Sequence, residues 1–391
     1  MNGAGHPLIF LIAGEPSGDQ LGARLMAALK TLAGGEVRFA GVGGEMMTAQ
    51  GLNSLFPIDD IAVSGLVEVI PHIPRILRRV RQTTAAARSL DADAVVTIDS
   101  PDFSFRVGRR LRDMDTALIH YVAPTVWAWK PRRAGKIAKF LDHLLLLYPF
   151  EGKEFDAVGL NSTFVGHPMI ESGLDRGDGP GFRERHGIAA EAKLLCVLPG
   201  SRTTETRRHL GLFGTVLGAL RERFSDLHVV VPTLATVGDA VRAGAASWPL
   251  PVTVTEGLNQ KRDAFAASDA ALAASGTVTL ELALARVPMV VAYKTSAVTA
   301  WVLRRMVYAK YASLVNLILD RELVPEILLE QCTPERLVEA LVPVLGDDAV
   351  RQAQLSGMAE AVAALDNGRP PSTFAAAIVL DLARRRGRQT T

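Results

Sequence analysis

Short apolar runs, each followed by a turn and a helix-like stretch, recur along almost the whole chain and constrain its fold more than any other feature. In the first half these runs occupy 8–13, 37–42, 94–99, 117–122, 144–148 and 163–166. They return at 194–200, 228–234, 252–257, 270–276 and 289–294. Strands of this kind, alternating with amphipathic helices, form parallel sheets that are covered on both faces. The pattern predicts an α/β protein with two doubly wound parallel sheets.

A polar, glycine-rich break at 171–190 separates the two series of runs. Such a composition is typical of a linker. We therefore expect a Rossmann-like domain over 1–172, a linker over 173–190, a second Rossmann-like domain over 191–345 and a helical tail over 346–391.

Length and composition restrict the class of protein. A chain of 391 residues is long enough for two cores, and 48% apolar with 21% charged residues is a globular composition. The net charge of +2 argues against a nucleic-acid partner. Cys196 and Cys332 allow neither a disulfide framework nor a zinc site, which favours a reducing compartment. We expect no signal peptide, and no apolar stretch approaches the roughly 20 residues of a spanning helix.

Three glycine-rich corners follow expected strands, at 13–25, 198–205 and 274–281. None matches the glycine pattern of dinucleotide-binding sites or the Walker pattern, which argues against NAD or ATP as the ligand. Each places small residues before a helix, where unpaired backbone N–H groups favour an anion. Ligands in open parallel sheets bind at this edge.

The corner residues suggest how a nucleotide diphosphate would bind. Arg202 can neutralise its charge with a planar fork of donors. Glu281 lies about one turn into a helix, where a carboxylate can accept two ribose hydroxyls. Taken singly, Ser-Gly-Thr is a common helix cap and Glu281 a solvated residue, but three corners together indicate a cleft enzyme that uses a nucleotide sugar. The small residues expected to approach a phosphate are Gly200, Ser201, Ser275, Gly276 and Thr277.

The chain closely resembles the lipid-A-disaccharide synthase family, inverting glycosyltransferases with the GT-B architecture of two Rossmann-like domains facing across a cleft. The departures from the family pattern are Pro16, Ser64, Ser100 and the basic run Arg207-Arg208-His209. The matching stretches are GEPSGDQLGARL (14–25), IDSPDFSFR (98–106), HYVAPTVWAWKPRR (120–133), FVGHPM (164–169), LPGSR (198–202), ASGTVTLE (274–281) and SLVNLILDRELVPE (313–326).

The resemblance implies a reaction. The 6-hydroxyl of 2,3-diacylglucosamine 1-phosphate attacks UDP-2,3-diacylglucosamine, which gives a β-1,6-linked tetraacyl disaccharide 1-phosphate and UDP in lipid A biosynthesis. It also implies a cytoplasmic protein, peripheral on the inner membrane of a Gram-negative bacterium. Homo-oligomerisation through the C-terminal region is an open alternative.

The reaction needs a base on the acceptor hydroxyl and support for the departing UDP. Asp99 ends an expected strand, and both this position and the resemblance favour it as the base; the alternative is a turn cap, for which Asp102 is the better candidate. The resemblance favours a catalytic role for Asn316 over a buried structural amide. Arg202 is expected to support the leaving diphosphate.

The first corner is expected to form the acceptor side. Ser17 could equally be the N-cap of the first helix, and Asp19 could serve only the helix dipole. His167 is kept as a candidate because it lies near the expected domain crossing. The predicted acceptor-side residues are Glu15, Ser17, Gly18, Asp19 and His167.

We expect neither a metal nor another cofactor. Asp91 and Asp93 have the D-x-D spacing of some metal-dependent sugar transferases, but they precede a strand and should lie at the wrong edge of the sheet. No His, Cys or Glu cluster has ligand spacing. Helix dipoles and Arg202 would replace the metal.

Acylated substrates call for an apolar surface. The segment 62–82 mixes apolar and arginine residues, as a helix on an anionic membrane does. We expect Ile76 and Leu77 to belong to the core, and Val69, Ile70 and Ile73 to be exposed. The stretch 297–311 repeats this mixture and is a second candidate for the contact.

Two other readings remain open at this point. One is another GT-B enzyme that uses UDP-N-acetylglucosamine, such as the transferase of peptidoglycan precursors or a 2-epimerase, since the 274–281 corner suits both. The other is a nucleotide-sugar-binding or membrane-scaffold protein without turnover. Donor preference and UDP release would separate these readings.

Overall fold

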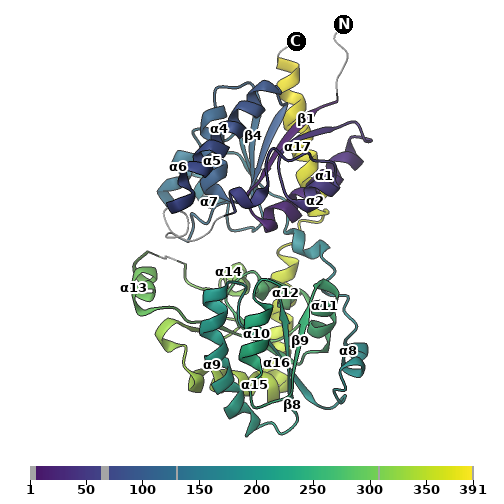
Figure 1. Ribbon diagram of the computed structural model, residues 1–391, viewed down its shortest axis with the longest axis vertical. Helices are drawn as coiled ribbons and strands as arrows, with labels where there is room; N and C mark the ends of the chain where they lie inside the picture. Colours follow the sequence, from purple (N-terminus) through teal and green to yellow (C-terminus); the bar gives the residue numbers. More distant parts are fainter. Residues whose placement is uncertain (1–5, 63–69, 129–130, 307–308, 390–391) are drawn as a thin grey trace. The chain divides into compact units, whose positions relative to one another are not determined.

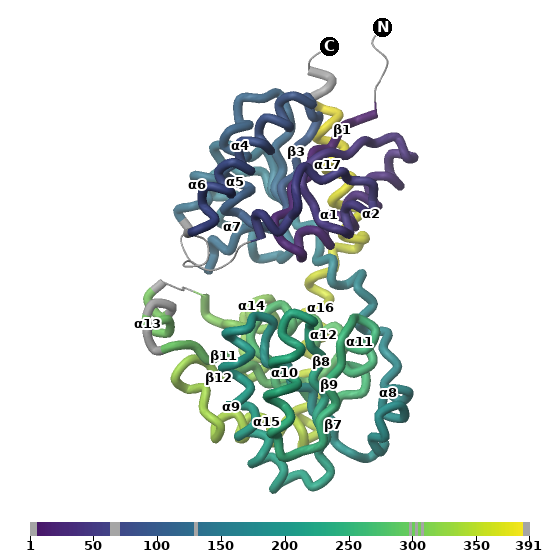
Figure 2. The backbone as a smooth tube through the Cα atoms, in the orientation of Figure 1, coloured from purple at the N-terminus to yellow at the C-terminus, as the bar shows by residue number. Residues whose placement is uncertain are grey.

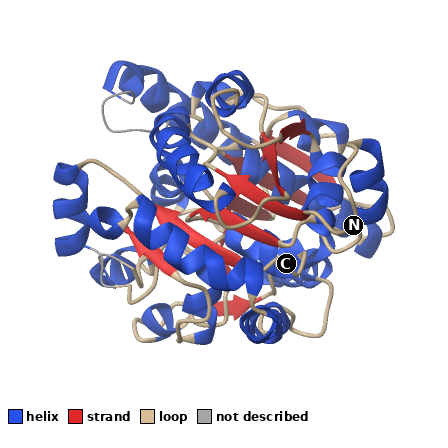
Figure 3. Cartoon of the chain, turned by 90° about the horizontal axis from the view of Figure 1, so that it is seen from below, coloured by secondary structure: helices blue, strands red, loops and turns tan. Residues whose placement is uncertain are grey.

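The computed structural model describes residues 6–62, 70–128, 131–306 and 309–389. The chain forms two compact units, one of residues 1–168 and 366–391 and the other of residues 169–365. Each unit has a six-stranded parallel sheet with helices on both faces (Figures 1 and 3). The predicted α/β class with two doubly wound sheets is confirmed.

The sheet of the first unit has the strand order β2-β1-β3-β4-β5-β6, with every pair parallel. The chain therefore leaves β1 toward one edge and reaches β3 on the other side of β1. The point between β1 and β3 is where connections diverge, which is where such sheets bind ligands. The strands are β1 Leu8–Ala13, β2 Arg38–Val42, β3 Ala94–Ile98, β4 Ala117–Tyr121, β5 His143–Leu146 and β6 Ser162–Phe164.

The sheet of the second unit has the order β12-β11-β10-β7-β8-β9 and is also parallel throughout. Its connections diverge between β7 and β10. The strands are β7 Lys193–Leu198, β8 Leu227–Thr233, β9 Val252–Glu256, β10 Ala270–Ala274, β11 Met289–Tyr293 and β12 Glu326–Leu328.

Helices bury apolar stripes on both faces of each sheet. In the first unit, α4, α5, α6 and α7 contribute to one core that includes Val80, Phe105, Ile137 and Phe155. On the other face α1 packs against α2 and α17. The helices of this unit are α1 Pro16–Leu32, α2 Glu45–Ala49, α4 Ile73–Ser89, α5 Pro101–Leu111, α6 Ala134–Ile137, α7 Lys153–Asp156 and α17 Pro371–Gln389.

In the second unit, α9, α10 and α15 cover one face of the sheet with residues such as Phe213, Val241 and Leu341. Other helices pair with one another as α8 with α11 and α12 with α16. The helices are α8 Gly179–Arg185, α9 Thr203–Arg221, α10 Gly238–Ala245, α11 Leu258–Ala267, α12 Val278–Leu284, α13 Ala297–Met306, α14 Leu314–Leu319, α15 Pro334–Gly346 and α16 Asp348–Ala363.

The last helix differs from the expected helical tail over 346–391. The chain returns to the first unit at Asp366, and α17 lies beside α1, so the two ends of the chain share one unit (Figure 2). Its buried residues Ala375, Ala376, Val379 and Leu380 explain the return, because α17 packs on α1, β3 and β4 of this unit.

The expected linker over 173–190 lies entirely within the second unit. Asp178 caps α8 by accepting from the backbone N–H of Gly181 at 2.9 Å, and Phe182 is fully buried. A glycine-rich composition therefore marked a short capped helix that packs on α11 rather than an independent connector. The unit boundary lies earlier, between Pro168 and Met169.

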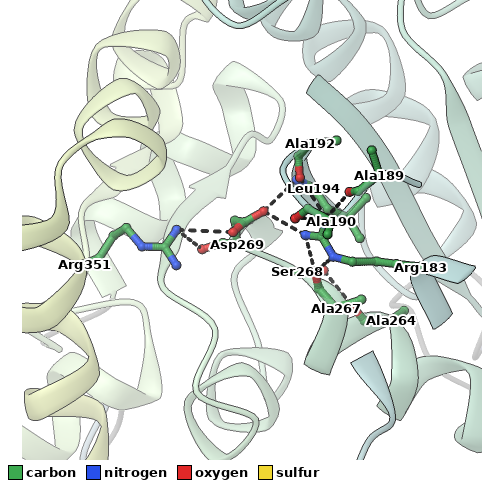
Figure 4. Close-up of polar contacts among 10 residues, drawn as sticks. All are labelled: Arg183, Ala189, Ala190, Ala192, Leu194, Ala264, Ala267, Ser268, Asp269 and Arg351. Carbon is green, nitrogen blue, oxygen red and sulfur yellow. Dashed lines mark hydrogen bonds and ion pairs between the residues drawn. The ribbon is translucent and has the colours of Figure 1, made fainter. Parts of the chain in front are cut away.

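A polar network joins α8, the starts of β7 and β10, and α16 (Figure 4). The Arg183 guanidinium donates to the backbone carbonyls of residues 189, 190, 192 and 267, and pairs with Asp269 at 3.0 Å. The same Asp269 carboxylate accepts from the backbone N–H of Leu194 at 2.8 Å. This network holds the amino edge of the sheet and leaves the carboxyl edge for ligands.

Candidate functional site

In the first unit, Asp99 and the 14–17 corner meet where the strand connections diverge. Asp99 follows β3, and Ser17 lies in the first turn of α1, which follows β1. Because β1 and β3 pair directly, with Ala13 opposite Ile98, the two corners are neighbours. Asp99 is half-buried and Ser17 is exposed.

The Asp99 carboxylate is held by two hydrogen bonds. One oxygen accepts from the backbone N–H of Ser100 at 2.8 Å, and the other accepts from Ser17 Oγ at 3.3 Å. The Ser104 hydroxyl donates to the Asp99 carbonyl at 2.8 Å. Asp99 and Ser100 have φ angles of 52° and 45°. Two successive non-glycine residues in this region store backbone strain, which is typical of functional sites.

Gly14 makes this turn possible. A Cβ atom at position 14 would overlap the side chain of Ser100. Close approach of the two strand-end corners therefore requires glycine there.

The remaining residues of the first corner divide into exposed and structural ones. Glu15 is exposed and is the N-cap residue of α1, so Ser17 is not the cap. Gly18 is buried against the end of β3. Asp19 is buried, and its carboxylate accepts from the backbone N–H groups of Gly44, Met46 and Met47 at 2.8–3.0 Å. The Asp19 carboxylate therefore caps α2.

The expected cap at Asp102 is wrong. Helix α5 begins at Pro101, so Ser100 is its N-cap residue and Asp102 lies inside the first turn. Ser100 has a left-handed conformation and the helix begins directly after it, two residues before the position that the apolar pattern indicated.

His167 lies beyond the edge strand β6, three strands from β3. Its Nε2 lies 3.3 Å from the Tyr148 hydroxyl, and burial lowers the pKa of His167 to about 4. The Glu151 carboxylate accepts from the N–H groups of Leu147 and Tyr148, both at 3.0 Å, and burial raises its pKa to about 7. The imidazole is neutral and belongs to a buried polar cluster, which the sequence pattern did not reveal.

In the second unit, the other two corners also meet where connections diverge. Gly200, Ser201 and Arg202 follow β7, and Ser275 follows β10, the strand paired with it. Gly200 has a φ of 119°, a conformation that favours glycine. Ser201 and Arg202 are exposed, and no described residue forms an ion pair with Arg202. Arg202 is the N-cap residue of the 19-residue helix α9, next to its unpaired N–H groups.

The Ser275 corner is fixed by backbone contacts. Its N–H donates to the carbonyl of Ala292 at 3.1 Å and its hydroxyl donates to that of Ala312 at 2.9 Å. Gly276 and Thr277 are exposed. The Ser275 hydroxyl is thus used within the protein, whereas Gly276 and Thr277 face solvent.

Glu281 has a partner that the motif did not indicate. Lys261 of α11 forms an ion pair with the Glu281 carboxylate, and both side chains are about one quarter exposed. Twenty residues separate the two in sequence, so the tertiary fold brings them together. The ammonium can orient the carboxylate and offset its charge beside an anionic ligand.

Asn316 is fully buried, and every polar atom of its amide has a partner. Its Nδ2 donates to the carbonyl of Val324 at 2.9 Å and to Glu326 at 2.8 Å, and its Oδ1 accepts from the N–H groups of Leu323 and Val324. Glu326 also accepts from the N–H groups of residues 312 and 313. Asn316 and Glu326 therefore organise residues 312–326, whose Ala312 carbonyl holds Ser275.

No metal-binding group was found among the described residues, where no three His, Cys, Asp or Glu side chains gather with ligand geometry. Asp93 of the D-x-D pair accepts from the N–H of Leu8 at 2.7 Å, at the amino edge of the sheet. This is the edge that the sequence predicted for it.

The expected membrane segment is partly described. Residues 63–69 lie outside the described residues, as does the side chain of Ile70. Ile73 at the start of α4 is 44% exposed, whereas Ile76 packs against the core and Leu77 is half-buried. Within the described part of the chain, no helix is long and apolar enough to cross a bilayer.

The chain is similar to known proteins along nearly its whole length. The family described as lipid-A-disaccharide synthetase matches residues 9–370. Lipid-A-disaccharide synthase of Rhodospirillum centenum is 55% identical, covering 97% of this chain and 95% of its own. The enzyme of Paramagnetospirillum magneticum is 51% identical, covering 96% and 98%.

Solved structures of other proteins share the fold. UDP-N-acetylglucosamine 2-epimerase of Neisseria meningitidis, bound to UDP-N-acetylglucosamine, has a TM-score of 0.63 at 9% identity and covers 97% of this chain and all of its own. MurG of Acinetobacter baumannii has a TM-score of 0.58 at 17% identity, covering 97% and 99%. These likenesses show the two-domain Rossmann-like GT-B fold.

Proposed function

This chain belongs to the lipid-A-disaccharide synthase family, and we propose that Asp99 is the base of the glycosyl transfer that it performs in lipid A biosynthesis. In the proposed reaction, the 6-hydroxyl of 2,3-diacylglucosamine 1-phosphate attacks the anomeric carbon of UDP-2,3-diacylglucosamine. The new O–C bond forms as the bond to UDP breaks, the configuration inverts, and the hydroxyl proton passes to Asp99.

The placement of Asp99 is the observation that carries this proposal. Its half-buried carboxylate lies at the diverging point of the first sheet and accepts from Ser17 and Ser100. These contacts orient the carboxylate while leaving it lone pairs for the acceptor hydroxyl. The exposed Glu15 and Ser17 would line the acceptor side of this corner.

The departing UDP is assigned to the second unit. Gly200 and Ser201 allow a phosphate to approach the N-terminus of α9, and the exposed Arg202 supplies a positive charge. Charge supplied in this way would support the leaving group without a metal. Glu281, oriented by Lys261, would accept the ribose hydroxyls, with Gly276 and Thr277 beside them.

Asn316 receives a positioning role in this proposal. Its saturated amide holds residues 312–326 in place, and the Ala312 carbonyl in turn fixes Ser275. Replacing Asn316 would therefore disturb the donor corner without removing a substrate contact.

The acylated substrates motivate a peripheral position on an anionic membrane. Ile73 is exposed at the start of α4 beside the arginine-rich face of that helix. Trp301 of α13 is 53% exposed and the guanidinium of Arg305 lies 3.8 Å from the centre of its ring. An aromatic ring with a neighbouring cation suits the interface of an anionic bilayer. The cytoplasmic face of the inner membrane would be the site of action, because the donor is a nucleotide sugar.

UDP release tests the proposed function. Purified protein would receive UDP-2,3-diacylglucosamine with and without 2,3-diacylglucosamine 1-phosphate, in a metal chelator, for wild type and Asp99→Asn. Acceptor-dependent release that survives the chelator and collapses in the variant is expected. Release that persists in Asp99→Asn would move the base elsewhere, and no release at all would favour the other GT-B reading, in which UDP-N-acetylglucosamine is the donor.

A further inference from the structure

Two side chains on the first turns of α9 reach back to the corner that precedes this helix. Thr206 Oγ1 donates to the carbonyl of Gly200 at 3.1 Å. His209 Nδ1 donates to the carbonyl of Pro199 at 2.8 Å. The i, i+3 spacing of the two residues places them on one helix face, so α9 fixes two successive carbonyls of the loop that carries Arg202.

His209 also contacts the end of a second strand. Its Nε2 accepts from the backbone N–H of Lys294, the residue after β11, at 3.2 Å. In the sheet, β10 lies between β7 and β11, so the imidazole joins the ends of the two strands that flank β10.

This arrangement determines the state of the ring. A backbone N–H donates to Nε2 and a carbonyl accepts from Nδ1, so the imidazole is neutral with its proton on Nδ1. His209 has no exposed surface and stacks on Phe213 with ring centres 5.2 Å apart. Burial lowers its pKa, and the charged groups facing it are Glu205 and Arg208 on α9 and Lys294 after β11.

We propose that His209 is a positioning residue for the nucleotide diphosphate, since it fixes the Pro199–Arg202 corner and the end of β11 on either side of the Ser275 corner. This inference rests on the proposed function, which assigns UDP to these corners. The basic run Arg207-Arg208-His209 departs from the family pattern in sequence, and the structure gives its third member a buried, uncharged role.

The two contacts can be separated by substitution. An asparagine amide reaches the position of Nδ1, so His209→Asn retains a donor for the Pro199 carbonyl. A glutamine amide reaches the position of Nε2, so His209→Gln retains an acceptor for the Lys294 N–H. His209→Phe keeps the ring beside Phe213 and removes both hydrogen bonds. Val216→Ala, a fully buried position two turns along α9, is the control for lost stability alone.

The measurement is UDP affinity by calorimetry on the full chain, well below each variant's melting temperature, together with donor KM and kcat. His209→Phe should weaken UDP binding about tenfold and raise donor KM, with kcat at saturating donor nearly unchanged. His209→Asn and His209→Gln should lie between wild type and His209→Phe, and Val216→Ala should lower only the melting temperature.

Unchanged UDP affinity in His209→Phe, with a loss of stability like that of Val216→Ala, would overturn the inference. If His209→Phe does not fold, wild-type affinity in both the Asn and Gln variants would overturn it equally. Arg202→Ala separates this result from a failure of the proposed function. If Arg202→Ala weakens UDP binding and the His209 variants do not, only the role of His209 falls; if wild type binds no UDP, both fall.

Discussion

Ser17 donates a hydrogen bond to Asp99 at 3.3 Å across two neighbouring strand ends, although 82 residues separate them in sequence. The contact exists because β1 and β3 are paired and Gly14 lets their corners approach. It joins the two motifs of the first unit into one site. Ser17 is thus placed to orient the carboxylate that we assign as the base.

Ser17→Ala should lower kcat by roughly three- to tenfold, because one long, exposed hydrogen bond that orients the carboxylate is lost. Asp99→Asn should lower it by about 10²–10⁴-fold, the usual contribution of a general base. Asparagine tolerates the left-handed φ of Asp99, so this variant should remain folded. Steady-state kinetics check both, with Gln20→Ala, an exposed change in the same helix, as the control. An unchanged kcat in Ser17→Ala would show that Ser17 does not orient the Asp99 carboxylate.

Glu281→Ala should remove most of the preference for UDP over 2′-deoxy-UDP. A carboxylate that accepts ribose hydroxyls contributes hydrogen bonds of a charged group, so UDP affinity should fall about tenfold or more while that for the deoxy analogue falls less. Calorimetry with both nucleotides checks this, and Glu322→Ala, an exposed acid of the same unit, is the control. An equal loss for both nucleotides would place Glu281 away from the 2′-hydroxyl.

The strand pattern and the corners were predictable because they are local. Eleven expected strands are present, because an apolar run in the sequence indicates a buried parallel strand. β12 was missed, because three residues after Pro325 carry too little pattern. Asp99 was placed at a strand end by the same reasoning, and the pairing of β1 with β3 confirms that position.

Partners that depend on tertiary packing were not predictable. Nothing near Glu281 marks Lys261, and nothing in the run around Asn316 shows that Glu326 and three backbone groups would occupy its amide. Asp19 was predicted to contact the acceptor substrate, but its carboxylate accepts three backbone N–H groups at the start of α2. The glycine-rich composition of residues 171–190 likewise predicted a linker, whereas the chain forms the helix α8, which packs on α11.

Asp269→Ala should destabilise the second unit by roughly 2 to 4 kcal/mol, because Arg183, with 14% of its side chain exposed, would lose its carboxylate. Asp239→Ala breaks a pair of similar length, 2.9 Å, that is exposed on the surface, and should cost much less because solvent screens that pair. Denaturant unfolding checks the difference. UDP affinity should not change in either variant, because the Asp269 network lies at the amino edge. Equal costs for the two variants would show that Arg183 does not depend on Asp269.

Glu151→Gln should stabilise the first unit at high pH. Burial raises the pKa of Glu151 from 4.5 to about 7, so the folded state holds its proton where the unfolded chain has lost it. The resulting stability is full below pH 4.5 and is lost as the pH rises through 7. Glutamine keeps an acceptor for the N–H groups of Leu147 and Tyr148 without a charge.

The gain of Glu151→Gln should therefore reach up to roughly 3 kcal/mol at pH 8 and shrink toward zero near pH 5. Thermal unfolding of wild type and variant across this range measures it. Glu45→Gln, an exposed acid of the same unit, is the control for the loss of one negative charge. A gain that is the same at both pH values would exclude buried ionisation as its cause.

Ile73→Ser combined with Trp301→Ser should reduce binding to vesicles that contain anionic lipid. Each change removes an exposed apolar side chain that has basic residues beside it, and each should lower the partition constant several-fold. Vesicle flotation at low and at physiological salt measures this, and binding should weaken as salt rises, because part of it is electrostatic.

Leu90→Ser is the matched control for Ile73→Ser. Leu90 is 45% exposed, almost the same as Ile73, but it lies at the other end of α4, about 25 Å away along the helix. A membrane contact at the start of α4 requires that Leu90→Ser leave flotation unchanged. If the Leu90 and Ile73 variants lose the same amount of binding, general hydrophobicity accounts for it and the start of α4 is not the lipid-facing site.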